Sequence, residues 1–259
     1  MTQTASRHTA TGDRDAAIVG RDDDASWRVL YRTAGVAALV TAVLIPIQIA
    51  VFTIFPFPET VAGWFALLRE QPLVGLVDLD LLLVVDNVLL VVIALAVYVA
   101  LRRADPSVVL LATGLWLLAI VMFVASNPSV EMLALSGRFA DATTAAERAA
   151  SLGAGQALLA AWEGTAFHLA YVVGQFAGIV IGVVMLRTDR FGRAVPYTLI
   201  IGNVVGFGYY LPTVGLALSA FAGVILWVWY LLIARRLFQL SRAPAASHVD
   251  RRHADIPGG

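Results

Sequence analysis

Ionisable and amide side chains interrupt some of the most apolar stretches of this 259-residue chain. The side chains concerned are Asp78, Asp80, Asp86, Asn87, Glu163, His168, Gln175 and Asn203. An ionisable group in hydrocarbon costs about 2.5–3.5 kcal/mol on insertion scales, so each one requires a structural or functional reason. Histidine titrates near neutral pH and a buried carboxyl can titrate in the same range, so this combination is typical of proton handling or of polar-ligand binding.

Membrane helices must position these groups, because 59% of the residues are hydrophobic and only 14% are charged. Soluble domains average about 45–50% apolar and about 25% charged residues. The composition therefore excludes a soluble enzyme, a disordered chain and a nucleic-acid-binding protein. Six segments are long and apolar enough to cross a bilayer. They are residues 29–55, 73–101, 108–125, 157–186, 195–211 and 214–238. The predicted fold is an all-α membrane bundle of six transmembrane helices.

Arginine placement predicts the orientation of this bundle. Fifteen of the 18 basic residues, all arginines, fall on the side that holds both termini, and three fall on the other. The positive-inside rule then puts both termini in the cytoplasm. Residues 28–240 form the predicted transmembrane domain, and the polar segments 1–27 and 241–259 are predicted to be disordered cytoplasmic tails, because their composition cannot bury enough apolar surface to fold.

Depth along the predicted helices brings three of the polar groups to a similar level. The helical rise puts Asp86 about 16 Å and His168 about 12 Å below the outer edge, and Asn203 about 10 Å above the inner edge. The remaining acids lie nearer the outer edge. We therefore predict a cavity open to the outer leaflet, with acids at its entrance and an Asp86–His168 pair at its base. The alternative interpretation is a hydrogen-bonded polar cluster that fixes helix register.

Small residues recur at four-residue spacing, which lets helix backbones approach closely. The predicted packing glycines are Gly174, Gly178 and Gly182 in one helix and Gly202 and Gly206 in another. Packing within the chain is the first interpretation, and a homodimer through the glycine stripe is the second. Aromatic residues that include Trp229 and Tyr230 are interpreted as a belt at the membrane interfaces.

Two longer segments on the outer side carry helix signals. Val61, Trp64, Phe65 and Leu68 recur at i, i+3, i+4 and i+7, which predicts a short amphipathic helix on the outer surface. In the second segment, residues 127–155, a capping-box pattern at residues 144–147 predicts a helix start. Gly153 and Gly155 are expected to break that helix at the membrane edge.

The chain resembles a bacterial family of six-span integral membrane proteins that share a domain of unknown function. The resemblance covers residues 28–238. It is carried by Pro46, Val77-Asp78-Leu79, Asp86, the run Phe167-His168-Leu-Ala-Tyr171-Val-Val-Gly174, Pro196 and Gly202-Asn203. It implies a six-span fold in the bacterial inner membrane and no established activity.

Several functions remain open at this level. The first is transport or binding of a small or lipid-like molecule in the outward-facing cavity. The second is a membrane-embedded enzyme of the terpene-cyclase kind, in which a protonated acid donates its proton to an alkene. The third is a structural partner of another membrane protein. The expected partners are the lipid bilayer and a small ligand, with no nucleic acid. No nucleotide-binding, hydrolase or metalloprotease motif is present. His168 is the one histidine within the predicted membrane segments, and with scattered acids it is a weak metal set, so no cofactor and no metal are expected.

Overall fold

The computed structural model describes residues 26–242, so the predicted tails lie almost entirely outside the described residues. Within this range the chain is helical and contains no strand. The elements are α2 (Arg28–Ile54), α3 (Val61–Glu70), α4 (Pro72–Asp78), α5 (Leu81–Leu101), α6 (Pro106–Ser126), α7 (Ser129–Asp141), α8 (Ala145–Trp162), α9 (Thr165–Leu186), α10 (Ala194–Gly206), the 3₁₀ turn η1 (Phe207–Tyr210) and α11 (Gly215–Ser241).

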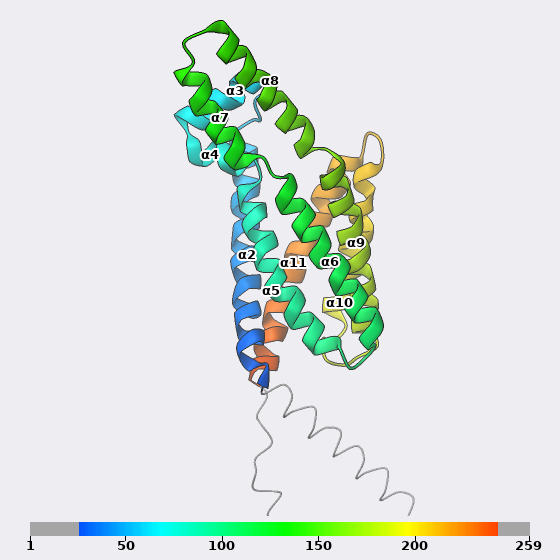
Figure 1. Ribbon diagram of the computed structural model, residues 1–259. Helices are drawn as coiled ribbons and strands as arrows, with labels where there is room; N and C mark the ends of the chain where they lie inside the picture. Colours follow the sequence, from blue (N-terminus) through cyan, green and yellow to red (C-terminus); the bar gives the residue numbers. More distant parts are fainter. Residues whose placement is uncertain (1–25, 243–259) are drawn as a thin grey trace, which may run out of the picture.

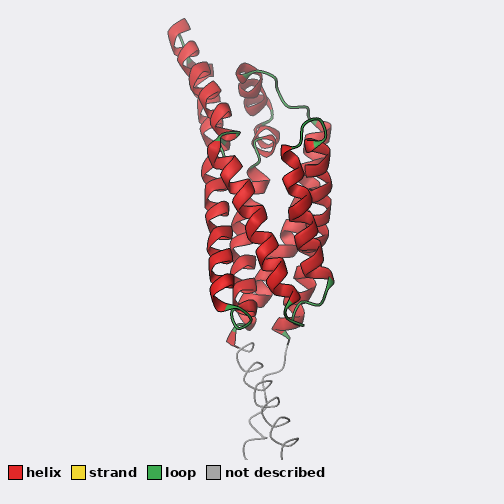
Figure 2. Ribbon diagram, turned by 90° about the vertical axis from the view of Figure 1, so that its right-hand side faces the viewer, coloured by secondary structure: helices red, strands yellow, loops and turns green. Residues whose placement is uncertain are grey.

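Helices that run side by side along the bundle (Figures 1 and 2) form a closed ring through their contacts. Around the ring the order is α2, α5, α6, α9, α10 and α11, and α11 packs back against α2. Each of these helices makes its main contacts with the two that flank it. Consequently no helix of the described residues runs through the middle of the ring, and side chains of the surrounding helices line its interior. The start of α2 and the end of α11 lie at the same end of the bundle, the lower end in Figure 1.

Five helical stretches are long and apolar enough to cross a membrane. Two of them join an outer helix to a ring helix, α7 to α6 and α8 to α9, and the others are α2, α5 and α11. The predicted fifth span corresponds to α10 and η1, which have 13 and 4 residues. The predicted separation of residues 195–211 from residues 214–238 is confirmed, because η1 ends at Tyr210 and α11 begins at Gly215.

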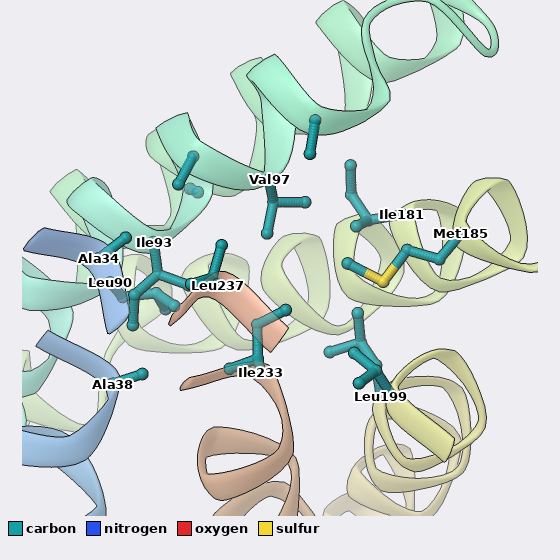
Figure 3. Close-up of a cluster of buried hydrophobic side chains, with 14 of the residues drawn as sticks. Ala34, Ala38, Leu90, Ile93, Val97, Ile181, Met185, Leu199, Ile233 and Leu237 are labelled. Carbon is teal, nitrogen blue, oxygen red and sulfur yellow. The ribbon is translucent and has the colours of Figure 1, made fainter. Parts of the chain in front are cut away.

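Apolar side chains fill the ring at the end where α2 begins and α11 ends. In Figure 3, Val97, Ile181, Met185, Leu199 and Ile233 point toward one another from four helices. Val97, Ile181, Met185 and Ile233 have no exposed surface, and Leu199 is 2% exposed. We call these five residues the apolar plug, since they close the ring interior at this level.

The opposite end of the bundle carries α3, α4, α7 and α8, which surround a second hydrophobic cluster. Val61, Trp64, Phe65 and Leu68 are all buried, so the predicted apolar face of α3 is confirmed. This face does not rest on the membrane surface, however. It packs against α7 and α8, and the rings of Phe65 and Phe139 lie 5.4 Å apart.

The predicted helix over residues 73–101 is wrong, because the chain breaks between α4 and α5. Asp80 adopts a left-handed conformation with φ 64°. The carbonyl oxygen of Leu79 accepts hydrogen bonds from Asn127 Nδ2 at 2.6 Å and from Ser129 Oγ at 3.2 Å. Side chains from the α6–α7 connection therefore stabilise a break that has no proline or glycine to signal it.

The second outer segment also differs from expectation. Its capping box is confirmed, since Thr144 Oγ1 accepts from the Glu147 amide and Glu147 Oε2 accepts from the Thr144 amide. The break expected at Gly153 and Gly155 is wrong, because α8 continues through both residues. The helix ends at Trp162, and α9 begins after Gly164. Residues 129–141, expected as loop, form α7.

Candidate functional site

A cavity of about 310 Å³ lies inside the ring. Its lining comes from α5, α6, α9, α10 and α11. On α5, α9 and α11 the residues that line the cavity lie closer to the outer helices than the residues of the apolar plug do. The plug therefore separates the cavity from the end of the bundle where α2 begins and α11 ends. Of the eight polar residues singled out in the sequence, the structure brings four to this cavity: Asp86, Asn87, Gln175 and Asn203.

Asp86 is the acid of this site and is 7% exposed. Its Oδ2 accepts a hydrogen bond from the Tyr230 hydroxyl at 3.3 Å. Its Oδ1 is buried and has no hydrogen-bond partner in the described part of the chain. Thr41 of α2 is a further polar neighbour of the carboxyl, although its hydroxyl oxygen makes no hydrogen bond of normal geometry. The carboxyl group is thus only half satisfied.

The amide side chains of the site are held by their own helices. Asn87 Nδ2 donates to the Leu83 carbonyl oxygen at 2.8 Å, and Asn203 Nδ2 donates to the Leu199 carbonyl oxygen at 2.6 Å. A carbonyl oxygen only accepts, so each amide must present its NH₂ group to the helix. The side-chain carbonyl oxygens of Asn87 and Asn203 therefore remain as acceptors.

His168 does not join Asp86, so the expected pair is not formed. Its Nδ1 lies 3.2 Å from the Tyr210 hydroxyl, and its ring packs among Phe167, Tyr209 and Tyr210. The physical reason is the position of the helix start. Since α9 begins at Thr165, His168 occupies its first turn, about 4.5 Å from the helix end, instead of the depth expected for a longer helix.

Asp78, Asp80 and Glu163 lie with the outer helices and away from the cavity lining. Burial raises the pKa of Asp78 to about 6. Burial also raises the pKa of Asp80 to about 7, although Trp162 Nε1 donates a hydrogen bond to its Oδ2 at 3.2 Å and opposes the shift. This bond connects the α4–α5 break to the end of α8. Glu163 follows Trp162 at the α8–α9 break.

Aromatic side chains form much of the cavity wall, and the sequence interpretation missed their role. Trp116, Tyr171, Trp229 and Tyr230 all line the cavity. Trp229 is 1% exposed and packs against Trp116 and Tyr230, with ring centroids 6.1 Å and 5.1 Å away. The indole nitrogen of Trp229 is buried without a partner among the described residues. The interpretation of Trp229 and Tyr230 as interfacial belt residues is wrong, and their mid-helix position in α11 was the available signal.

The glycine faces are occupied by neighbouring helices of the same chain. A Cβ atom on Gly178 would lie 2.6 Å from Asn203 Nδ2, and one on Gly182 would lie 2.6 Å from Ile200 Cγ1. On α10, Gly206 faces Gln175 of α9. The remaining two contact other ring helices: Gly202 faces Leu226 of α11 and Gly174 faces Ala119 of α6. Close approach at these glycines brings the polar residues of α9 and α10 to the cavity.

The fold and the cavity together define the class of protein. The chain is an all-helical protein with five helical stretches apolar enough to cross a membrane, arranged as part of a ring around a cavity with one carboxyl group and an aromatic wall. No family model, curated protein or solved structure matches the chain. The functional argument therefore depends on the site itself.

Proposed function

We propose that this chain is a six-span protein of a bacterial cytoplasmic membrane that binds, and in the membrane transports, a small molecule that is mostly apolar. The sixth crossing is α10 with η1, about 27 Å long at the rises of α and 3₁₀ helices. This length approaches the roughly 30 Å of a hydrocarbon core. The assignment to a bacterial membrane is the expectation that comes from the sequence resemblance.

Arginine distribution supports a cytoplasmic location for both chain ends. Ten of the 13 described arginines lie at the end of the bundle with the start of α2 and the end of α11. The other three, Arg69, Arg138 and Arg148, lie in the outer helices. An even number of crossings agrees with both chain ends being at one end of the ring.

One observation carries the binding proposal. The cavity combines a largely apolar and aromatic lining with a few convergent polar groups, which is the usual composition of a small-molecule site. A polar cluster that served only to fix helix register would be expected to satisfy its own members. Here Asp86 Oδ1 has no hydrogen-bond partner among the described residues, so the cluster leaves its own acid incompletely satisfied.

A cavity-filling substitution tests the binding proposal. Gly223 lines the cavity, and nothing lies within 4 Å of where its Cβ would be, so Gly223→Leu should fill the space without moving a helix. Gly114→Leu is the matched control, because Gly114 is equally unobstructed but is exposed on α6 and does not line the cavity.

The assay is isothermal titration calorimetry of 2-phenylethanol and 2-phenylethylammonium into protein in nanodiscs, with empty nanodiscs subtracted. We expect saturable binding of at least one compound to the unmodified chain and to Gly114→Leu, and affinity about tenfold or more lower in Gly223→Leu. Equal affinity in all three proteins, or binding in none of them, would show that the cavity is not a binding site for these compounds.

Cysteine labelling tests the orientation, since the chain has no cysteine of its own. Ala146→Cys lies exposed near the start of α8, and Ala104→Cys lies exposed in the turn between α5 and α6. In intact cells a membrane-impermeant maleimide should label Ala146→Cys only. Labelling of Ala104→Cys without lysis would reverse the proposed orientation.

A further inference from the structure

The charge of the cavity wall has one sign. Among the described residues that line it, Asp86 is the only acid, and there is no arginine or histidine. A buried carboxylate without a neighbouring cation is costly, because the low-dielectric interior does not replace its hydration. Binding of a positive charge next to Asp86 would offset that cost, whereas an anionic ligand would add to it.

Several hydrogen-bond donors of the cavity wall are used within the chain. The Tyr230 hydroxyl donates to Asp86, and the Tyr171 hydroxyl donates to the Gly206 carbonyl oxygen at 2.8 Å. The NH₂ groups of Asn87 and Asn203 donate to their own helices. The side-chain oxygens of Asn87 and Asn203 therefore remain as acceptors beside Asp86, while the Trp229 indole N–H is a buried donor without a partner among the described residues. The acceptors stand next to the acid of the wall, so N–H donors of a ligand would find partners there.

Aromatic faces provide the third part of the match. Trp229 is in ring contact with both Trp116 and Tyr230, and the Tyr230 hydroxyl also donates to the Asp86 carboxyl. Aromatic faces attract organic cations through the ring quadrupole, and the attraction is stronger where water is excluded. They also cover the apolar part of a ligand. A bare inorganic ion would leave most of a cavity of about 310 Å³ unfilled.

We propose that the cavity binds a protonated organic amine, with the ammonium group paired to Asp86 and the apolar part against the Trp116–Trp229–Tyr230 wall. This inference rests on the proposed function, because it names the ligand class of the same cavity. In this arrangement Tyr230 is a positioning residue that orients the carboxyl through its hydroxyl group.

A charge series of similarly sized compounds tests the ligand class on the unmodified protein. The compounds are 2-phenylethylammonium, 2-phenylethanol and 3-phenylpropionate, titrated into nanodisc-held protein at one pH. We expect the ammonium compound to bind about tenfold or more tightly than the alcohol, and the carboxylate to bind most weakly. Equal affinity of the ammonium and the alcohol, or preference for the carboxylate, would overturn the inference.

Asp86→Asn provides the second measurement, because an amide keeps an acceptor for Tyr230 but removes the charge. The preference for the ammonium compound over the alcohol should fall to about twofold or less. Glu131→Gln is the matched control, since it makes the same change at an exposed residue of α7 and should keep the full preference. A preference that survives Asp86→Asn would overturn the role of Asp86.

The two proposals fail in different ways. If the alcohol binds, and Gly223→Leu blocks it, but charge has no effect, the cavity remains a binding site and only the amine class is wrong. If neither the alcohol nor the ammonium compound binds, the binding function itself is wrong.

Discussion

Glycines of α9 share one helix face but meet different neighbours, and this difference predicts a graded response to alanine. A Cβ on Gly174 would lie 3.5 Å from the Cβ of Ala119, which is ordinary van der Waals contact. A Cβ on Gly178 would lie 2.6–2.7 Å from three atoms of the Asn203 amide. We therefore expect Gly174→Ala to be tolerated and Gly178→Ala to destabilise the fold.

The magnitude follows from two opposing effects. Replacing glycine by alanine inside a helix favours folding by about 1 kcal/mol. At Gly178 the added methyl group must displace Asn203, which is buried and held by its 2.6 Å hydrogen bond to Leu199. Overpacking costs about 1–3 kcal/mol, and loss of the hydrogen bond adds about 1 kcal/mol. Gly178→Ala should therefore be about 2–4 kcal/mol less stable than Gly174→Ala.

Thermal unfolding followed by circular dichroism, in one detergent and at one protein concentration, measures this difference. Gly114→Ala is the control for helix propensity alone, because nothing lies within 4 Å of a Cβ at that position. The double variant Gly178→Ala/Asn203→Ala should recover part of the loss, since the obstructing amide is gone. If Gly178→Ala unfolds at the same temperature as Gly174→Ala, close packing of α9 on α10 is not the reason for this glycine.

Three further substitutions test other parts of the structure. Thr60→Ala should lower the free energy of unfolding by about 1 kcal/mol, because Thr60 Oγ1 accepts a hydrogen bond from the Gly63 amide at 3.1 Å at the start of α3. Thr60→Ser keeps a hydroxyl group at this position, so its Tm in thermal unfolding should stay close to that of the unmodified chain. Asp80→Asn tests a pH dependence. Burial raises the Asp80 pKa to about 7 from 3.8, so the folded chain keeps a proton that the unfolded chain loses, and stability falls as pH rises from about 4 to about 7. Asparagine also tolerates the left-handed turn, so a Tm-against-pH profile should fall less steeply in the variant, and an unchanged profile would exclude Asp80 as a cause. Tyr171→Phe should lower the Tm, because the free energy of unfolding loses about 1 kcal/mol when the 2.8 Å hydrogen bond from the Tyr171 hydroxyl to a carbonyl oxygen at the end of α10 is removed. Equal Tm values would show that water replaces this hydrogen bond.

Hydropathy located the ring helices, because membrane-spanning helices require long apolar segments whatever their neighbours are. It merged α4 with α5 and the end of α8 with α9. The face of α3 was likewise predictable, since Val61, Trp64, Phe65 and Leu68 follow the helical period. The break at Asp80 was not, because it depends on hydrogen bonds from Asn127 and Ser129, which are distant in sequence. Hydropathy carries no information about such contacts.

The candidate site was predicted in part for the same reason. Asp86, Gln175 and Asn203 stand out because polar groups are rare in apolar helices, and the structure places all three at the cavity. The depth of His168 was misjudged because it depends on where α9 begins. As a sign of a helix break, the single Gly164 was less conspicuous in the sequence than the pair Gly153 and Gly155. The aromatic wall was missed since an apolar helix does not reveal which of its faces looks inward.

A ring without a central helix has a consequence for how the chain can diversify. Ala119, Ala170, Gly174, Ala222 and Gly223 all line the cavity with minimal side chains. Exchange of one such residue for a larger one at an unobstructed position such as Gly223 changes the space inside while the helix backbones stay where they are. A substitution at such a position would therefore change the size of the molecule that fits the cavity while the helix framework is kept.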